Sequence, residues 1–139
     1  MSRAVRKLTV VVLAVLADMH AAWAFGSPVP APNRRELADL VAGTAEMPGT
    51  AECLAVSGLL GAAAVVVAGP RWLPARMRQI GAGGVATVLA ARAMLGATGR
   101  TGSVVPWTPS ERFRRLDRNY YAPLCAMLAL GSLLATRRG

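Results

Sequence analysis

A few polar side chains stand inside long apolar stretches of this 139-residue chain, and their chemistry is the first thing to explain. Asp18 and Arg92 are ionisable, and an unpaired charge near the centre of a bilayer costs roughly 2.5–3.5 kcal/mol on insertion scales. At 1.5 Å per helical residue, Asp18 lies about 16 Å from Lys7 and Arg92 about 21 Å from Arg78. Because these depths match, the sequence predicts an intramembrane ion pair between Asp18 and Arg92.

Other polar and aromatic residues reach a similar depth. His20 and Trp23 are three residues apart and therefore share one helix face. The same rise places Tyr121 and Cys125 about 18–24 Å from the basic residue that flanks their own stretch. These residues and Arg92 predict a small polar pocket in the outer half of the protein. The alternative interpretation is structural, with the ion pair fixing helix register and His20 hydrogen-bonded.

Several kinds of site do not fit the sequence. A lone histidine without a second nitrogen or thiolate at helical spacing falls short of three or four metal ligands, so neither a metal nor a cofactor is expected. Cys53 and Cys125 differ by about 9 Å in depth, whereas bridged Cα atoms lie within about 7 Å. No catalytic residue is assigned. We expect a binding or accessory component, with a membrane enzyme that uses His20 as acid or base as the alternative.

Four apolar stretches must position these side chains: 8–25, 52–70, 79–98 and 119–136. Each approaches the 20 or so helical residues that cross a hydrocarbon core about 30 Å thick. Hydrophobic residues make up 54% of the chain and charged residues 17%, far fewer charges than in an average soluble domain. We therefore expect one all-α integral membrane domain over residues 1–139, a four-helix bundle.

The first stretch has a competing interpretation. The basic segment before it and the small residues around Trp23 are also typical of a cleavable secretory signal peptide. Asp18 and His20 lie between the apolar core and that cleavage site, and three further spans follow. These features favour a retained helix.

Both outer loops carry signals of short interfacial helices. Asn33, with Glu36 three residues later, has the spacing of a capping box. Thr108 precedes Pro109 and stands three residues before Glu111, which predicts a second helix capped by Thr108. That helix is basic and amphipathic, as in helices that lie at a membrane surface. Its arginines, Arg112, Arg114, Arg115 and Arg118, surround Phe113 and Leu116.

The net charge of +9 is distributed as in a membrane protein. Basic residues flank the apolar stretches, where anionic lipid head groups would lie, so the lipid bilayer is the expected partner and nucleic acid is not. A small apolar ligand or a membrane protein is a further possible partner. Three basic residues precede the first stretch, whereas Arg34 and Arg35 follow it at a distance. We therefore predict a protein of the cytoplasmic membrane with both termini cytoplasmic.

Two short blocks carry a family resemblance. One runs from His20 through Trp23 to Gly26, and the other from Arg112-Phe113 through Asp117 to the segment Tyr120-Tyr121-Ala-Pro123-Leu-Cys125. With these blocks the chain resembles a bacterial family of small four-helix integral membrane proteins that is classed as a domain of unknown function. The resemblance covers nearly the whole chain and implies an architecture and a set of residues without implying a reaction.

Overall fold

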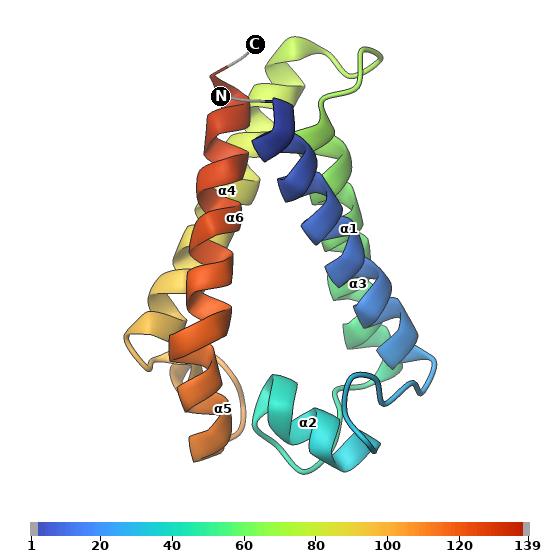
Figure 1. Cartoon of the computed structure of the whole chain (residues 1–139), viewed down its shortest axis with the longest axis vertical. Coiled ribbons are helices and arrows are strands. Elements are labelled where there is room, and N and C mark those ends of the chain that lie inside the picture. The colour runs from blue at the N-terminus through green and yellow to red at the C-terminus, as the bar shows by residue number, and fades with distance from the viewer. Residues whose placement is uncertain (1–2, 138–139) are drawn as a thin grey trace.

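The chain folds into helices joined by turns (Figure 1). A computed structural model describes residues 3–137, and that range contains no strand, which confirms the all-α prediction. Arg138, one of the two arginines that follow the last apolar stretch, lies outside the described residues. The elements are α1 (Arg3–Ala24), α2 (Arg34–Ala42), α3 (Thr50–Ala68), α4 (Ala75–Ala97), η1 (Thr101–Ser103), α5 (Glu111–Leu116), η2 (Asp117–Tyr121) and α6 (Ala122–Thr136).

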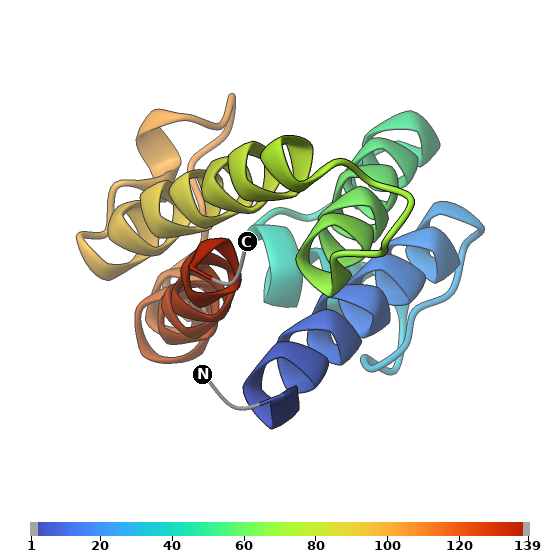
Figure 2. The ribbon, with the colours of Figure 1, turned by 90° about the horizontal axis from the view of Figure 1, so that it is seen from above.

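The long helices form two pairs. Helix α1 packs along α3, and α4 packs along α6 (Figures 1 and 2). The pairs converge at the end that carries both ends of the chain and diverge toward the opposite end, where α2 lies between them (Figure 1). We call the first the terminal end and the second the α2 end.

The pairs meet in a small apolar core. Leu13 of α1, Ala64 and Val67 of α3, and Leu128 of α6 are buried together. Small residues such as Ala64 let helix backbones approach closely, which is how helices associate where lipid removes the hydrophobic driving force. This core, at the middle of α1 and α6, holds the pairs together and leaves the α2 end to be closed by other contacts.

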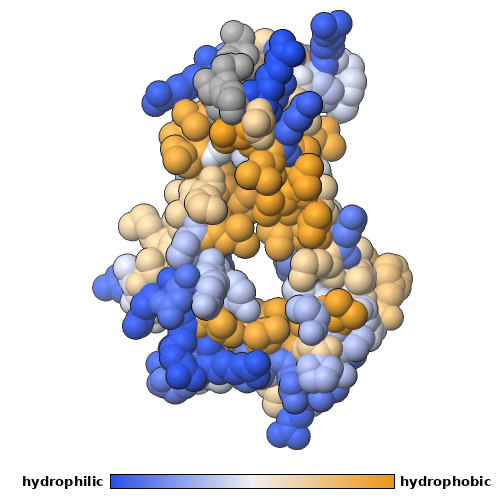
Figure 3. Space-filling view, viewed as in Figure 1, coloured by the Kyte–Doolittle hydropathy of each residue, from blue (hydrophilic) through white to orange (hydrophobic). Residues whose placement is uncertain are grey.

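The outer surface of the long helices is apolar. Leu8 of α1, Val88 of α4 and Met127 of α6 are each about two-thirds exposed, and Figure 3 shows an apolar zone between hydrophilic regions at the two ends. Three helices, α1, α3 and α4, are long and apolar enough to cross a membrane. Exposed apolar side chains on such helices are stable facing lipid, so the fold is that of a membrane protein.

The predicted fourth span is divided. Helix α5, the five-residue π-helix η2 and the 15-residue helix α6 follow one another directly, with no turn or loop between them. Pro123 explains the division, because it lacks the amide hydrogen of an α-helical bond and its ring crowds the carbonyl four residues earlier. The amide of Ala122 instead bonds the carbonyl of Asp117, five residues back, which is the wider π spacing.

The two outer loops form helices, with one correction at a cap. Asn33 caps α2 as predicted, because its side chain accepts a bond of 2.9 Å from the Glu36 amide. Helix α5 is capped by Ser110, whose hydroxyl accepts from the Phe113 amide, and the prediction that Thr108 caps it is wrong. The start lies two residues later because Pro109 precedes the helix instead of occupying its first turn.

Gly131 tests the packing of the two pairs. A Cβ there would collide with the Oγ1 atom of Thr9 on α1, whereas a Cβ on Gly84 of α4 would meet nothing within 4 Å. We expect Gly131→Val to lower the free energy of unfolding by about 1–3 kcal/mol, the usual cost of overpacking, and Gly84→Val to change it little. Thermal unfolding of both variants in mild detergent checks this. Equal midpoints for the two variants would contradict the described contact between α1 and α6.

Candidate functional site

The most deeply buried charge in the described range is Asp117, whose side chain is 3% exposed. Its Oδ1 atom lies 2.8 Å from Nη2 of Arg92, and its Oδ2 atom accepts a hydrogen bond of 2.5 Å from the Thr101 hydroxyl. The Arg92 side chain is 33% exposed. A carboxylate removed from water needs an opposite charge and hydrogen-bond donors, and Asp117 has both. The pair joins α4, η1 and η2.

Two backbone features make room for this ion pair. Gly96 stands one helical turn after Arg92, and a Cβ there would lie 2.6 Å from Asp117 Oδ1 and 2.9 Å from Ala122 Cβ. Only a glycine therefore allows η2 to approach α4 so closely. The π-helix is the second feature, because Asp117 is its first residue and its one buried residue.

The predicted partner of Arg92 is wrong. Arg92 pairs with Asp117, and Asp18 is exposed on α1, with no ion pair recorded for it between residues 3 and 137. The reason lies in the helix arrangement: α1 packs on α3 while α4 packs on α6, so residues of α1 and α4 at equal depth are not neighbours. A depth estimate gives one coordinate and cannot show which helices are adjacent.

A second set of contacts ties α2 to the α4–α6 pair. The Tyr121 hydroxyl donates a hydrogen bond of 2.7 Å to the Leu40 carbonyl, and Nε1 of Trp107 donates one of 2.8 Å to the Ala42 carbonyl. Both carbonyls belong to the last turn of α2, where backbone oxygens have no partner within the helix. Tyr121 of η2 and Trp107 of the loop before α5 therefore complete the hydrogen bonding of the last turn of α2.

His20 and Trp23 belong to the other helix pair. The Nδ1–H group of His20 donates to the Leu16 carbonyl at 2.7 Å, and its ring centre lies 4.7 Å from that of Trp23. Nε1 of Trp23 donates to the Val29 carbonyl at 2.6 Å. Of the two neutral tautomers, this bond selects the one with the proton on Nδ1, in which Nε2 carries the lone pair. No hydrogen-bond partner of Nε2 is present in the described part of the chain.

The five predicted pocket residues thus fall into two groups. Arg92, Tyr121 and Cys125 lie on α4, η2 and α6, where Tyr121 and Cys125 are within electrostatic range of Arg92. His20 and Trp23 lie together on α1. Across residues 3–137 no hydrogen bond, ion pair or ring contact joins the two groups directly. A single contiguous pocket therefore stays a prediction.

The cysteines are both free, with Cys53 buried and Cys125 half-buried. Within the described range no three His, Cys, Asp or Glu side chains come together in a way that could hold a metal ion. Sequence reasoning missed Asp117, Thr101 and Trp107 as structural residues. Asp117 alone carried a signal, because it stands four residues before Tyr121 in the same block and thus on the same helical face.

Asp117→Asn tests the buried pair. The substitution leaves the Arg92 charge without its counter-ion, so we expect the free energy of unfolding to fall toward the lower end of the ~3–5 kcal/mol typical of broken buried pairs. The matched control is Asp39→Asn, which removes the exposed pair with Arg112 (3.6 Å) and should cost ~0–1 kcal/mol. Both values come from unfolding curves in mild detergent. Similar losses in the two variants would show that Asp117 is not specially stabilised.

Comparisons with known proteins give a family and no activity. A family model described as a protein of unknown function (DUF3995) matches residues 13–132, a stretch that includes His20, Trp23, Arg92, Asp117, Tyr121 and Cys125. No curated protein and no solved structure is similar enough to match. The match covers most of the chain and confirms the resemblance to a domain of unknown function. The chain is therefore a member of the DUF3995 family of proteins of unknown function.

Proposed function

We propose that the chain crosses the cytoplasmic membrane four times, with both termini in the cytoplasm. Helix α6 alone spans about 22 Å at 1.5 Å per residue, and the five residues of η2 extend it toward the thickness of a hydrocarbon core. Four crossings fit the location of both ends of the chain on one side (Figure 1). Arg3, Arg6 and Lys7 before the first span favour the cytoplasm as that side.

Labelling of introduced cysteines checks this topology. Ser103→Cys lies in η1 at the α2 end, and Ala75→Cys begins α4 at the terminal end. In a Cys53→Ser, Cys125→Ser background, a membrane-impermeant maleimide should label Ser103→Cys in intact cells and label Ala75→Cys only after lysis. The reverse pattern would place the termini outside, and labelling of both sites in intact cells would show that α4 does not cross the membrane, which would contradict four crossings.

The binding role rests on the opening between the two helix pairs. Figure 3 shows a gap through the molecule that is bordered on its lower side by apolar surface, at the position of α2 in Figure 1. In a membrane this opening would be filled by lipid or by a ligand, because an empty space of that kind loses dispersion contacts on every wall. It is the feature that best supports a binding component.

His20 and Tyr121 are the polar residues that we place at this opening. Leu16 and Leu124 pack against the core where the pairs meet. His20 stands four residues after Leu16, and Tyr121 stands three residues before Leu124, so each continues the same helix face one turn toward the α2 end. The Tyr121 hydroxyl already donates its hydrogen to a carbonyl of α2. The Nε2 lone pair of His20 is therefore the acceptor left for a ligand.

The chemistry of these walls defines the ligand class. Apolar helix faces favour an apolar body, and a neutral imidazole with a free Nε2 favours a hydroxyl or N–H donor on that body. A lipid-soluble alcohol, phenol or quinol has both features. The same Nε2 atom is the one that a general base would use, which keeps the enzyme alternative tied to the same residue.

Mass spectrometry of molecules that co-purify in mild detergent tests the binding role. The wild-type protein should retain a small apolar molecule, and His20→Phe, which keeps a ring beside Trp23 without either nitrogen, should lower its occupancy at least about tenfold, a loss of roughly 1.4 kcal/mol. The control is Thr87→Val on an exposed face of α4. Equal occupancy in His20→Phe and wild type would refute the site, and conversion of the captured molecule on incubation would favour the enzyme.

A further inference from the structure

A second cavity lies at the terminal end, far along the helices from the opening described above. Its volume is about 140 Å³, and it forms where α1, α3, α4 and α6 converge. The polar residues in its wall are Arg6 of α1 and Arg78 and Gln79 of α4, beside Gly69 and Ala135. Two arginines around so small a space indicate an anionic occupant.

Neither arginine is neutralised within the described chain. The ion pairs recorded over residues 3–137 are those of Arg92 and Arg112, at the other end of the helices. Nη1 of Arg78 lies 3.5 Å from the Pro70 carbonyl and 3.4 Å from that of Leu73, which are long hydrogen bonds. A guanidinium has five N–H donors, so most donors of both arginines are available to a ligand.

The side-chain charge around the cavity has one sign. Every one of the seven Asp and Glu residues of the sequence lies in the other half of the fold or in its loops, and the nearest along α1 is Asp18. The N-termini of α1 and α4 add partial positive charge, which the C-termini of α3 and α6 offset. The full side-chain charges therefore decide the potential. The basic residues at this end are Arg3, Arg6, Lys7, Arg71, Arg76, Arg78 and Arg137.

From this cavity we infer a binding site for the phosphate group of an anionic phospholipid. Arginine matches phosphate through paired N–H donors, and basic pockets between helices on the cytoplasmic side are suited to lipid head groups. The rest of the cavity wall is small or apolar and consists of Val66, Val67, Gly69, Ala82 and Ala135. These would contact the acyl chains, which a free phosphate ion lacks.

Native mass spectrometry after exchange into mixed micelles tests the site. The purified protein is equilibrated with equal amounts of phosphatidylglycerol and phosphatidylcholine, and bound lipid is identified. The wild type should prefer phosphatidylglycerol, and Arg6→Gln with Arg78→Gln should lower that preference about 25-fold, or about fivefold per arginine. The Arg6 side chain has no hydrogen bond or ion pair with residues 3–137, so Arg6→Gln alone should show the fivefold effect without a change in the free energy of unfolding.

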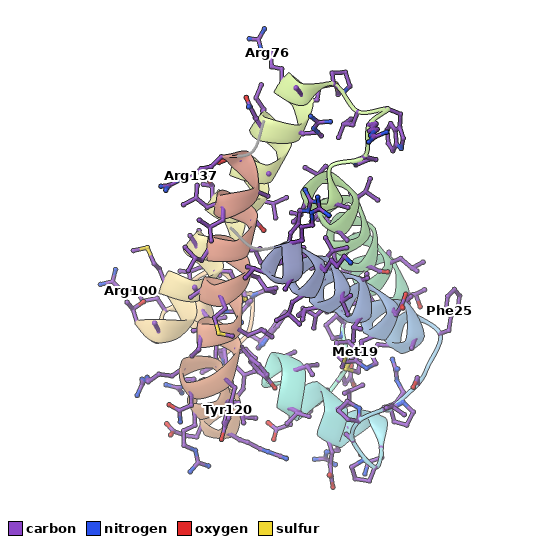
Figure 4. All side chains as sticks on the ribbon, turned by 45° about the horizontal axis from the view of Figure 1, so that its top comes forward. Met19, Phe25, Arg76, Arg100, Tyr120 and Arg137 are labelled. Carbon is purple, nitrogen blue, oxygen red and sulfur yellow. The ribbon has the colours of Figure 1, made fainter. Side chains whose placement is uncertain are left out.

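The matched control carries the same charge change at the same end. Arg3 and Arg76 are exposed and do not line the cavity, and Figure 4 shows Arg76 directed away from the helices. Arg3→Gln with Arg76→Gln should keep at least about half of the preference, because diffuse surface charge is screened by salt. Equal losses in the two double variants, or equal binding of both lipids by the wild type, would overturn the site. Displacement of the lipid by excess inorganic phosphate alone would overturn the assignment to a lipid.

Discussion

The buried carboxylate of Asp117 is the constraint on which the second half of the fold depends. A charge at 3% exposure is tolerated only where its counter-ion and donors are fixed in place, and Arg92 and Thr101 come from two different elements. Their meeting requires Gly96 on α4 and the widened turn of η2. Pro123, whose ring favours that wider turn, thus acts indirectly on a contact two turns away. The ion pair, the glycine on α4 and the π-helix before α6 together hold α4 against α6.

The first helix pair has no comparable charge, and its contacts with the second are of two kinds. Apolar packing around Leu13 and Leu128 holds the pairs together at the middle of α1 and α6. At the other end, α2 packs its buried face against Trp23 while its last carbonyls accept hydrogen bonds from Tyr121 and Trp107. Helix ends away from water need such donors. Because α2 provides the link, α1 and α6 need not touch there, and the space between the pairs stays open.

Local patterns in the sequence predict where the helices lie, but they do not predict which helices pack against each other. Apolar length predicted the helices, and the Asn33 side chain predicted the start of α2 correctly. The partner of Arg92 was missed because depth along the membrane normal is common to several helices, and the packing of α4 on α6 decides which is near. Asp117 falls between Leu116 and Arg118 of the helix that the sequence predicts at the membrane surface. In the structure Asp117 is buried as the first residue of the π-helix before Pro123, and a pattern of 3.6 residues per turn does not predict a π-helix.

The distribution of acidic residues divides the molecule into two chemically different ends. At the α2 end, arginines such as Arg92 and Arg112 find carboxylates within the chain, so that end can satisfy its own charges. At the terminal end, Arg6 and Arg78 surround a cavity and the sequence offers no nearby acid. Their counter-ions must then come from outside the described chain. The proposed orientation and the proposed lipid site therefore depend on the same interaction, the attraction between these basic residues and anionic lipid head groups.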